Sequence, residues 1–160
     1  MRRFVLAAMA LMLAGPAGAG ELRPFVQGSY AALVKEHAGR PLVIHFWSLT
    51  CAPCLVELPQ WREAQRHHPE MDLVLVATDS PDEAPKLGRT LTRAGLTGVD
   101  SWVFADSFAE RLRFEVDKTW HGELPMTRLV GRDGAAEAVT GTVSDAALAA
   151  WLARQPGGKP

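Results

Sequence analysis

Hydrophobic residues are distributed along the chain in a way that predicts strands and helices in alternation. Residues 42–47 and 72–77 are nearly unbroken apolar runs of strand length, a pattern typical of central strands buried on both faces of a sheet. Residues 101–105 predict a shorter strand. The stretch after residue 51 is predicted to be helical, because its apolar residues recur at helical intervals: Leu55, Leu58, Trp61 and Ala64.

Capping residues predict the remaining helices. A side-chain oxygen at a helix start can accept a hydrogen bond from a backbone N–H group that has no partner within the helix. We therefore expect helices over 29–38 and 80–94, each beginning with a serine cap. Two further helices are expected after Asp106 and Ser144.

The last part of the chain is predicted to form a β-hairpin followed by a helix. Residues 124–130 and 136–140 each suit a strand, and the Asp-Gly pair between them is typical of a hairpin turn. Segment 118–122 is expected to be an exposed loop before the first of these strands. The whole pattern predicts an α/β domain, with a mixed sheet covered by helices on both faces.

The N-terminal residues have the pattern of a secretory signal peptide. Two arginines precede the apolar run 4–13, and small residues at 17–19 supply a cleavage pattern. We predict a signal peptide over 1–20, one domain over 21–155 and a flexible tail over 156–160. Export would place the protein in the periplasm, which is an oxidising compartment. An uncleaved N-terminal membrane anchor is the alternative.

The only two cysteines, Cys51 and Cys54, lie between the predicted strand over 42–47 and the helix that follows it. A thiol at a helix start lies beside unpaired N–H groups and the positive end of the helix dipole, which both favour thiolate. A structural disulfide across so short a loop would remove little entropy from the unfolded chain. Structural zinc would require four ligands, and the chain has no second cysteine pair to supply them. A redox-active dithiol is the favoured interpretation, and we expect no metal site.

The residues around the cysteines resemble those of the thioredoxin-like superfamily. The motif is Phe46-Trp47-x-x-x-Cys51-x-Pro53-Cys54-x-x-Glu57-x-Pro59, and its last part is similar to TlpA/ResA-type extracytoplasmic thiol–disulfide oxidoreductases. The resemblance implies a thioredoxin fold, with a mixed central sheet, helices on both faces and a C-terminal β-hairpin plus helix. It also implies that Cys51 attacks a substrate disulfide and that Cys54 resolves the mixed disulfide.

Two residues are candidates for the base that takes a proton from Cys54. Glu57 lies three residues after Cys54 and, by resemblance, occupies the position of the family's buried active-site glutamate. His45 occupies a position where thioredoxins carry a buried acid. Burial should raise the pKa of Glu57 and lower that of His45. A solvated helix glutamate and a simple core histidine are the alternative interpretations.

The resemblance also implies a substrate-binding surface around the dithiol. In this family a cis-proline faces the two cysteines, and Leu124-Pro125 occupies the matching place before the predicted hairpin. We expect a cis bond there, beside backbone that is free to pair with an extended substrate segment. Trp47, Thr50 and Pro53 are the other candidates for substrate contacts. Thr50 stands where thioredoxins carry a tryptophan.

The predicted function is that of a periplasmic thiol–disulfide oxidoreductase that requires no cofactor. We expect a monomeric reductase whose partners are a disulfide-containing protein substrate and a membrane electron donor of the thioredoxin-reducing type. Cytochrome c maturation and copper-site maturation are candidate contexts. The net charge of −1 at pH 7, without a basic stripe, argues against a nucleic-acid partner. A dithiol oxidase of the same fold, a Cu(I)-binding metallochaperone and a catalytically idle binding module are the alternatives.

Overall fold

The computed structural model describes residues 22–156 of the chain. The predicted signal peptide and all of the predicted tail except Pro156 lie outside the described residues. Within this range, no helix is both long and apolar enough to cross a membrane. The elements are β1 (Arg23–Phe25), α1 (Ser29–Glu36), β2 (Leu42–Trp47), α2 (Ala52–His67), β3 (Asp72–Ala77), the 3-10 helix η1 (Pro81–Glu83), α3 (Ala84–Arg93), β4 (Asp100–Phe104), α4 (Ala109–Val116), β5 (Met126–Val130), β6 (Ala136–Thr140) and α5 (Asp145–Ala153).

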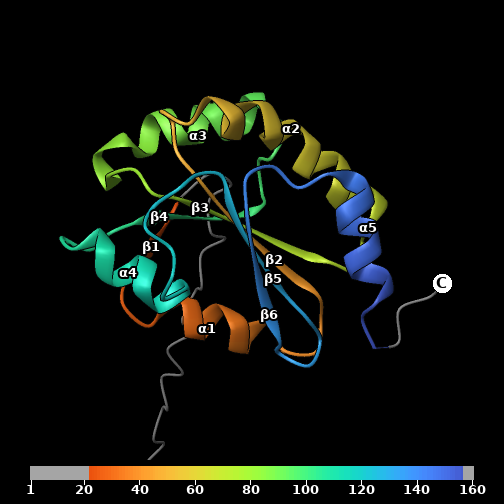
Figure 1. The fold of residues 1–160 in the computed structure, drawn as a ribbon. Coiled ribbons are helices and arrows are strands. Elements are labelled where there is room, and N and C mark those ends of the chain that lie inside the picture. The colour runs from red at the N-terminus through yellow and green to blue at the C-terminus, as the bar shows by residue number, and fades with distance from the viewer. Residues whose placement is uncertain (1–21, 157–160) are drawn as a thin grey trace, which may run out of the picture.

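The strands form one mixed sheet in the order β1-β4-β3-β2-β5-β6 (Figure 1). Strands β1, β4, β3 and β2 are parallel neighbours, whereas β5 pairs antiparallel with both β2 and β6. The hairpin of β5 and β6 is followed by α5. The predicted mixed sheet with a C-terminal hairpin plus helix is therefore confirmed.

Two hydrophobic cores, one on each face of the sheet, hold the layers together. On one face, α2, α3 and α5 contribute core residues such as Trp61, Leu87 and Trp151. On the other face, α1 and α4 contribute Leu33 and Leu112. Figure 1 shows these two sets of helices on opposite sides of the sheet. Helices therefore cover both faces, as the sequence predicts.

Strand β2 lies inside the sheet, and all of its residues are buried. Because successive side chains of a strand point to opposite faces, Val43 and Trp47 belong to the core under α2, whereas Ile44 and Phe46 belong to the other core. His45 has the same parity as Val43 and Trp47. Its imidazole therefore enters the core under the helix that carries the cysteines.

The predicted caps of two helices are wrong. Ser29 is the first residue of α1, and the cap position is Gly28, whose φ of 88° lies in the left-handed region that glycine adopts readily. Helix α1 also ends at Glu36, two residues earlier than expected. Asp106 instead shapes the turn before α4, because its carboxylate accepts a hydrogen bond from the Phe108 backbone at 2.8 Å.

Trp120 is buried, although its segment was expected to be an exposed loop. Its ring lies 4.9 Å from that of Phe46 in the core on the α1 side. Its indole N–H donates a hydrogen bond to the Glu123 carbonyl oxygen at 2.9 Å. The loop before β5 is therefore attached to the core through this side chain.

The N-cap of α5 provides a test of how firmly this helix is held. The Ser144 hydroxyl accepts a hydrogen bond from the Ala147 backbone at 3.2 Å. We expect Ser144→Ala to lower the free energy of unfolding by about 1 kcal/mol, because that N–H would lose its partner. Thr142→Ala removes an exposed hydroxyl nearby and should change stability by less than about 0.5 kcal/mol. Equal losses in urea unfolding would contradict the role of the cap.

Candidate active site

Both cysteines lie at the N-terminal end of α2, after a short loop from β2. They form a disulfide, with their Cα atoms 5.2 Å apart. Cys51 is the N-cap of α2 and is partly exposed, whereas Cys54 is fully buried. The Cys54 backbone N–H donates a hydrogen bond to the Cys51 sulfur at 3.2 Å. Cys51 is therefore the sulfur that a second protein can reach.

A carboxylate from the end of the next strand holds the loop before Cys51. Asp79 accepts hydrogen bonds from the Leu49 backbone at 3.1 Å and from the Ser48 hydroxyl at 3.3 Å. Burial raises the pKa of Asp79, and these hydrogen bonds oppose the shift. The sequence analysis missed Asp79. The available signal was its position, because parallel neighbours such as β2 and β3 end at the same edge of a sheet.

His45 and Glu57 form a buried pair between β2 and α2. Their exposed fractions are 0% and 1%, and His45 Nε2 lies 3.8 Å from Glu57 Oε2. Glu57 follows Cys54 by one helical turn, and both lie on the buried face of α2. The His45 ring also packs 5.1 Å from the Trp61 ring. The structure thus brings together both predicted candidate bases.

The outer atoms of this pair are held by residues from the C-terminal part of the chain. His45 Nδ1 lies 3.0 Å from the Thr127 hydroxyl on β5, and Glu57 Oε1 accepts a hydrogen bond from the Val143 backbone at 2.7 Å. Within the described range, His45 Nε2 and Glu57 Oε2 have no hydrogen-bond partner. The two inner atoms therefore lie 3.8 Å apart, with no other hydrogen-bond partner in the described range.

Burial determines where a proton resides in this pair. It lowers the pKa of His45 to about 3, because a charged imidazole would lose its hydration. Burial also raises the pKa of Glu57, while the Val143 N–H opposes that shift. Both directions disfavour an ion pair between a charged imidazole and a carboxylate at this position.

Several solved structures share this arrangement of strands and helices. A secreted disulfide oxidoreductase of Mycobacterium tuberculosis, homologous to E. coli DsbE, is 21% identical with a TM-score of 0.58, over 74% of this chain and 84% of that one. A thiol:disulfide interchange protein of the thioredoxin family from Chlorobium tepidum is 18% identical with a TM-score of 0.58, over 76% and 81%. The chain has a thioredoxin fold.

StoA from Bacillus subtilis is a third example of the thioredoxin fold. It is 24% identical with a TM-score of 0.52, over 71% of this chain and 83% of StoA. No protein-family model and no curated protein matches the sequence. The likeness to solved structures establishes the fold, and the chemistry rests on the residues of this chain.

The candidate substrate contacts differ in exposure. Thr50 and Pro53 are exposed on either side of Cys51 in the sequence, whereas Leu124 is partly buried and Pro125 is buried. The Leu124–Pro125 peptide bond is cis. Trp47 has an exposed fraction of 0% and packs in the core under α2. Its ring is thus not available for direct contact with a substrate in this structure.

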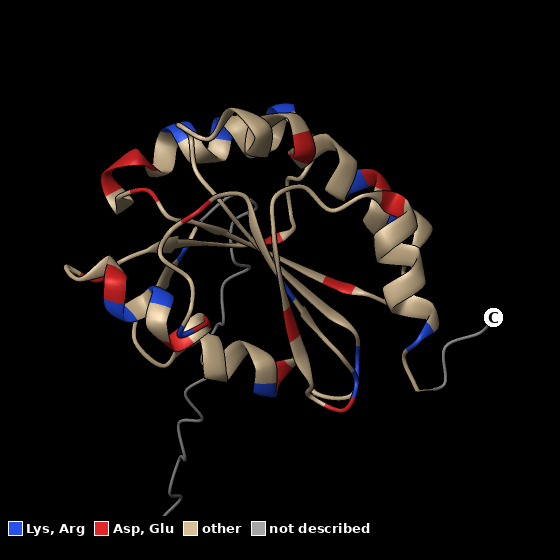
Figure 2. Ribbon diagram, in the orientation of Figure 1, with Lys and Arg blue, Asp and Glu red and all other residues tan. Residues whose placement is uncertain are grey.

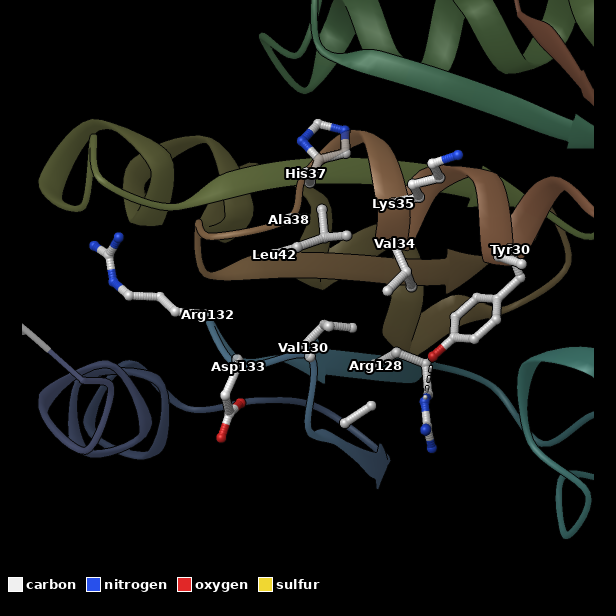
Figure 3. A pocket seen from close by; sticks show the side chains of 14 residues that line it. Tyr30, Val34, Lys35, His37, Ala38, Leu42, Arg128, Val130, Arg132 and Asp133 are labelled. Carbon is white, nitrogen blue, oxygen red and sulfur yellow. Dashed lines mark hydrogen bonds between the residues drawn. The ribbon is translucent and has the colours of Figure 1, made fainter.

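A separate cavity of about 620 Å³ lies between α1 and the β5–β6 hairpin (Figure 3). Apolar side chains line its middle, including Val34, Leu42 and Val130, and at one end Arg128 donates a hydrogen bond to the Tyr30 hydroxyl at 3.3 Å. Neither cysteine lines it, so it is not part of the dithiol site. Across residues 22–156, no three His, Cys, Asp or Glu side chains are grouped as metal ligands.

The buried His45 predicts a loss of stability in acid. Its pKa is lowered from 6.5 to about 3, so the unfolded chain binds a proton at His45 over this pH range while the folded protein does not. We expect the free energy of unfolding of the oxidised protein to fall as the pH decreases through this range. His45→Leu should reduce the fall. Denaturant unfolding at several pH values measures it.

Glu57 contributes to the pH dependence with the opposite sign. Its raised pKa favours the folded state at low pH, and that contribution is lost as the pH rises through the folded-state pKa. Because Glu57 is present in both proteins, comparing wild type with His45→Leu isolates the effect of the imidazole. Thr142→Ala, at an exposed residue that does not titrate, should retain the wild-type profile. A wild-type profile in His45→Leu as well would contradict the expectation.

Proposed function

We propose that the protein is a periplasmic thiol–disulfide oxidoreductase that reduces substrate disulfides through Cys51 and Cys54. The observation that carries the proposal is the asymmetry of the pair. One sulfur is partly exposed at a helix start, whereas the other is buried on the helix face that also carries Glu57. A nucleophile must reach its substrate, and a resolving thiol needs to reach only the nucleophile. Solved disulfide oxidoreductases with this fold add support.

In the first step, the Cys51 thiolate attacks one sulfur of the substrate disulfide. A bond forms between Cys51 and that sulfur, the substrate disulfide breaks, and the second substrate sulfur leaves as a thiolate. The Cys54 N–H, which is 3.2 Å from the Cys51 sulfur, would stabilise the negative charge before the attack.

We assign the contacts with substrate to residues near Cys51. Thr50 and Pro53 are exposed and adjoin it in the sequence, so they would contact the polypeptide around the substrate disulfide. Leu124 and Pro125 are proposed to supply backbone for pairing with an extended segment.

In the second step, Cys54 attacks Cys51 and releases the reduced substrate. Two electrons pass from the dithiol to the substrate, and Cys54 must first lose its proton. We assign the proton acceptor to ionised Glu57, because its raised pKa makes it the better base. His45, with a pKa of about 3, holds a proton poorly. His45 therefore acts as a neutral positioning residue beside Glu57.

A reductase in an oxidising compartment must be reduced again after each turnover. We propose a membrane electron donor of the thioredoxin-reducing type for this step. The Cys51–Cys54 couple should then have a reduction potential near that of thioredoxin, about −270 mV. Equilibration in dithiol buffers followed by thiol alkylation measures it. A value near about −120 mV would indicate a dithiol oxidase instead, and stoichiometric Cu(I) binding without disulfide reduction would indicate a metallochaperone.

The roles of the two sulfurs can be separated by substitution. Cys54→Ser should accumulate mixed disulfides on Cys51, because the resolving thiol is missing. Cys51→Ser should accumulate few or none, because Cys54 is buried. Non-reducing gels of periplasmic extracts show both results. Equal trapping by the two variants would mean that nucleophile and resolver are wrongly assigned.

A further inference from the structure

A groove of about 590 Å³, lined mostly by residues with polar or charged side chains, lies beside the dithiol, between the loop after β2 and helix α3. Leu49 and Thr50 form its wall on the loop side, and Thr50 immediately precedes Cys51. The wall on the helix side consists of residues spaced three and four apart along one face of α3: Lys86, Arg89, Thr90 and Arg93.

This groove has more positive charge than its own acids neutralise. Glu83 pairs with Lys86 at 2.8 Å, and the Asp79 carboxylate accepts hydrogen bonds from the loop. Arg89 and Arg93 are exposed, and neither forms an ion pair within 4.0 Å of any residue in the described range. Figure 2 shows the basic segments of α3 after an acidic segment at its start. Two guanidinium groups are therefore available to a ligand.

Both walls of the groove are held by internal contacts. On the loop side, the Thr50 backbone donates a hydrogen bond to the Ser48 hydroxyl at 3.1 Å, and Ser48 donates to Asp79. On the helix side, Leu87 and Leu91 anchor α3 in the core. A surface that is formed before binding requires less ordering when a ligand arrives.

We infer that this groove binds an acidic segment of the partner protein, next to the disulfide that Cys51 attacks. The inference rests on the proposed function. Arginine matches carboxylates well, because its planar guanidinium can donate two parallel hydrogen bonds. An extended chain advances about 3.3–3.6 Å per residue, so Asp or Glu residues close in sequence to the substrate cysteines would reach the groove. Opposite charges would also speed the encounter.

Three peptides with the same disulfide loop test the inference, with flanking residues that are all Asp/Glu, all Ser or all Lys. Their second-order rate constants with the reduced protein are divided by those with a neutral small-molecule dithiol, which corrects for intrinsic reactivity. We expect the acidic peptide to react at least about tenfold faster than the lysine peptide at low ionic strength. The ratio should shrink as salt is added, because both arginines are exposed.

Charge reversal on α3 locates the effect. Arg89→Glu/Arg93→Glu should abolish or invert the preference while changing the serine peptide's rate by no more than about twofold. Arg111→Glu/Lys118→Glu is the matched control, because it makes the same change in net charge at exposed residues in and just after α4, on the other side of the sheet. The control should retain the preference for the acidic peptide.

The outcomes separate this inference from the proposed function. Exchange with none of the peptides would overturn the proposed function and the inference with it. Equal corrected rates for all three peptides would overturn the inference alone. An equal loss of preference in the α3 and α4 variants would also overturn it, because the preference would then arise from the charge of the whole molecule.

Discussion

The candidate site depends on the burial of β2 between two neighbouring strands. Pairing with β3 on one side and β5 on the other fixes the register of β2 twice. Strand alternation then directs His45 to the face covered by α2. A register shift of one residue would move the imidazole to the opposite core, away from Glu57. Hydrophobic packing of the strand thus decides which polar groups lie in the core beneath the helix that carries Cys54.

Each residue of the polar pair in this core makes one side-chain hydrogen bond and leaves one polar atom without a partner in the described range. His45 uses one nitrogen toward Thr127, and Glu57 uses one oxygen for the Val143 N–H. A buried polar atom without a hydrogen-bond partner lowers folding stability by on the order of 1–3 kcal/mol. Two such atoms, 3.8 Å apart, therefore destabilise this core. The cost is understandable if this position must gain or lose a proton during turnover.

Much of the fold could be predicted from the sequence because its signals are local. The apolar run of β2, the helical spacing after Cys51 and the Asp-Gly turn of the hairpin each depend on adjacent residues. Thr127 and Val143 could not be predicted as partners, because they meet His45 and Glu57 across 82 and 86 residues. The burial of Trp120 was missed for a similar reason, since its ring packs on Phe46, which lies on a strand far from it in the sequence.

The region around the dithiol contains titratable groups in two different environments. One set is buried in the core, and the other is exposed on α3. Inside, burial lowers the pKa of His45 and raises that of Glu57, so the ionised Glu57 carboxylate is the stronger base and suits the proposed role of proton acceptor for a buried thiol. Outside, the proposed recognition charges on α3 are in contact with water, which suits rapid and reversible encounters. Asp79 links the groove to the dithiol, because its carboxylate lines the groove and fixes the loop that leads into Cys51. A partner that displaced this loop would therefore move the Cys51 sulfur as well, which is the proposed nucleophile.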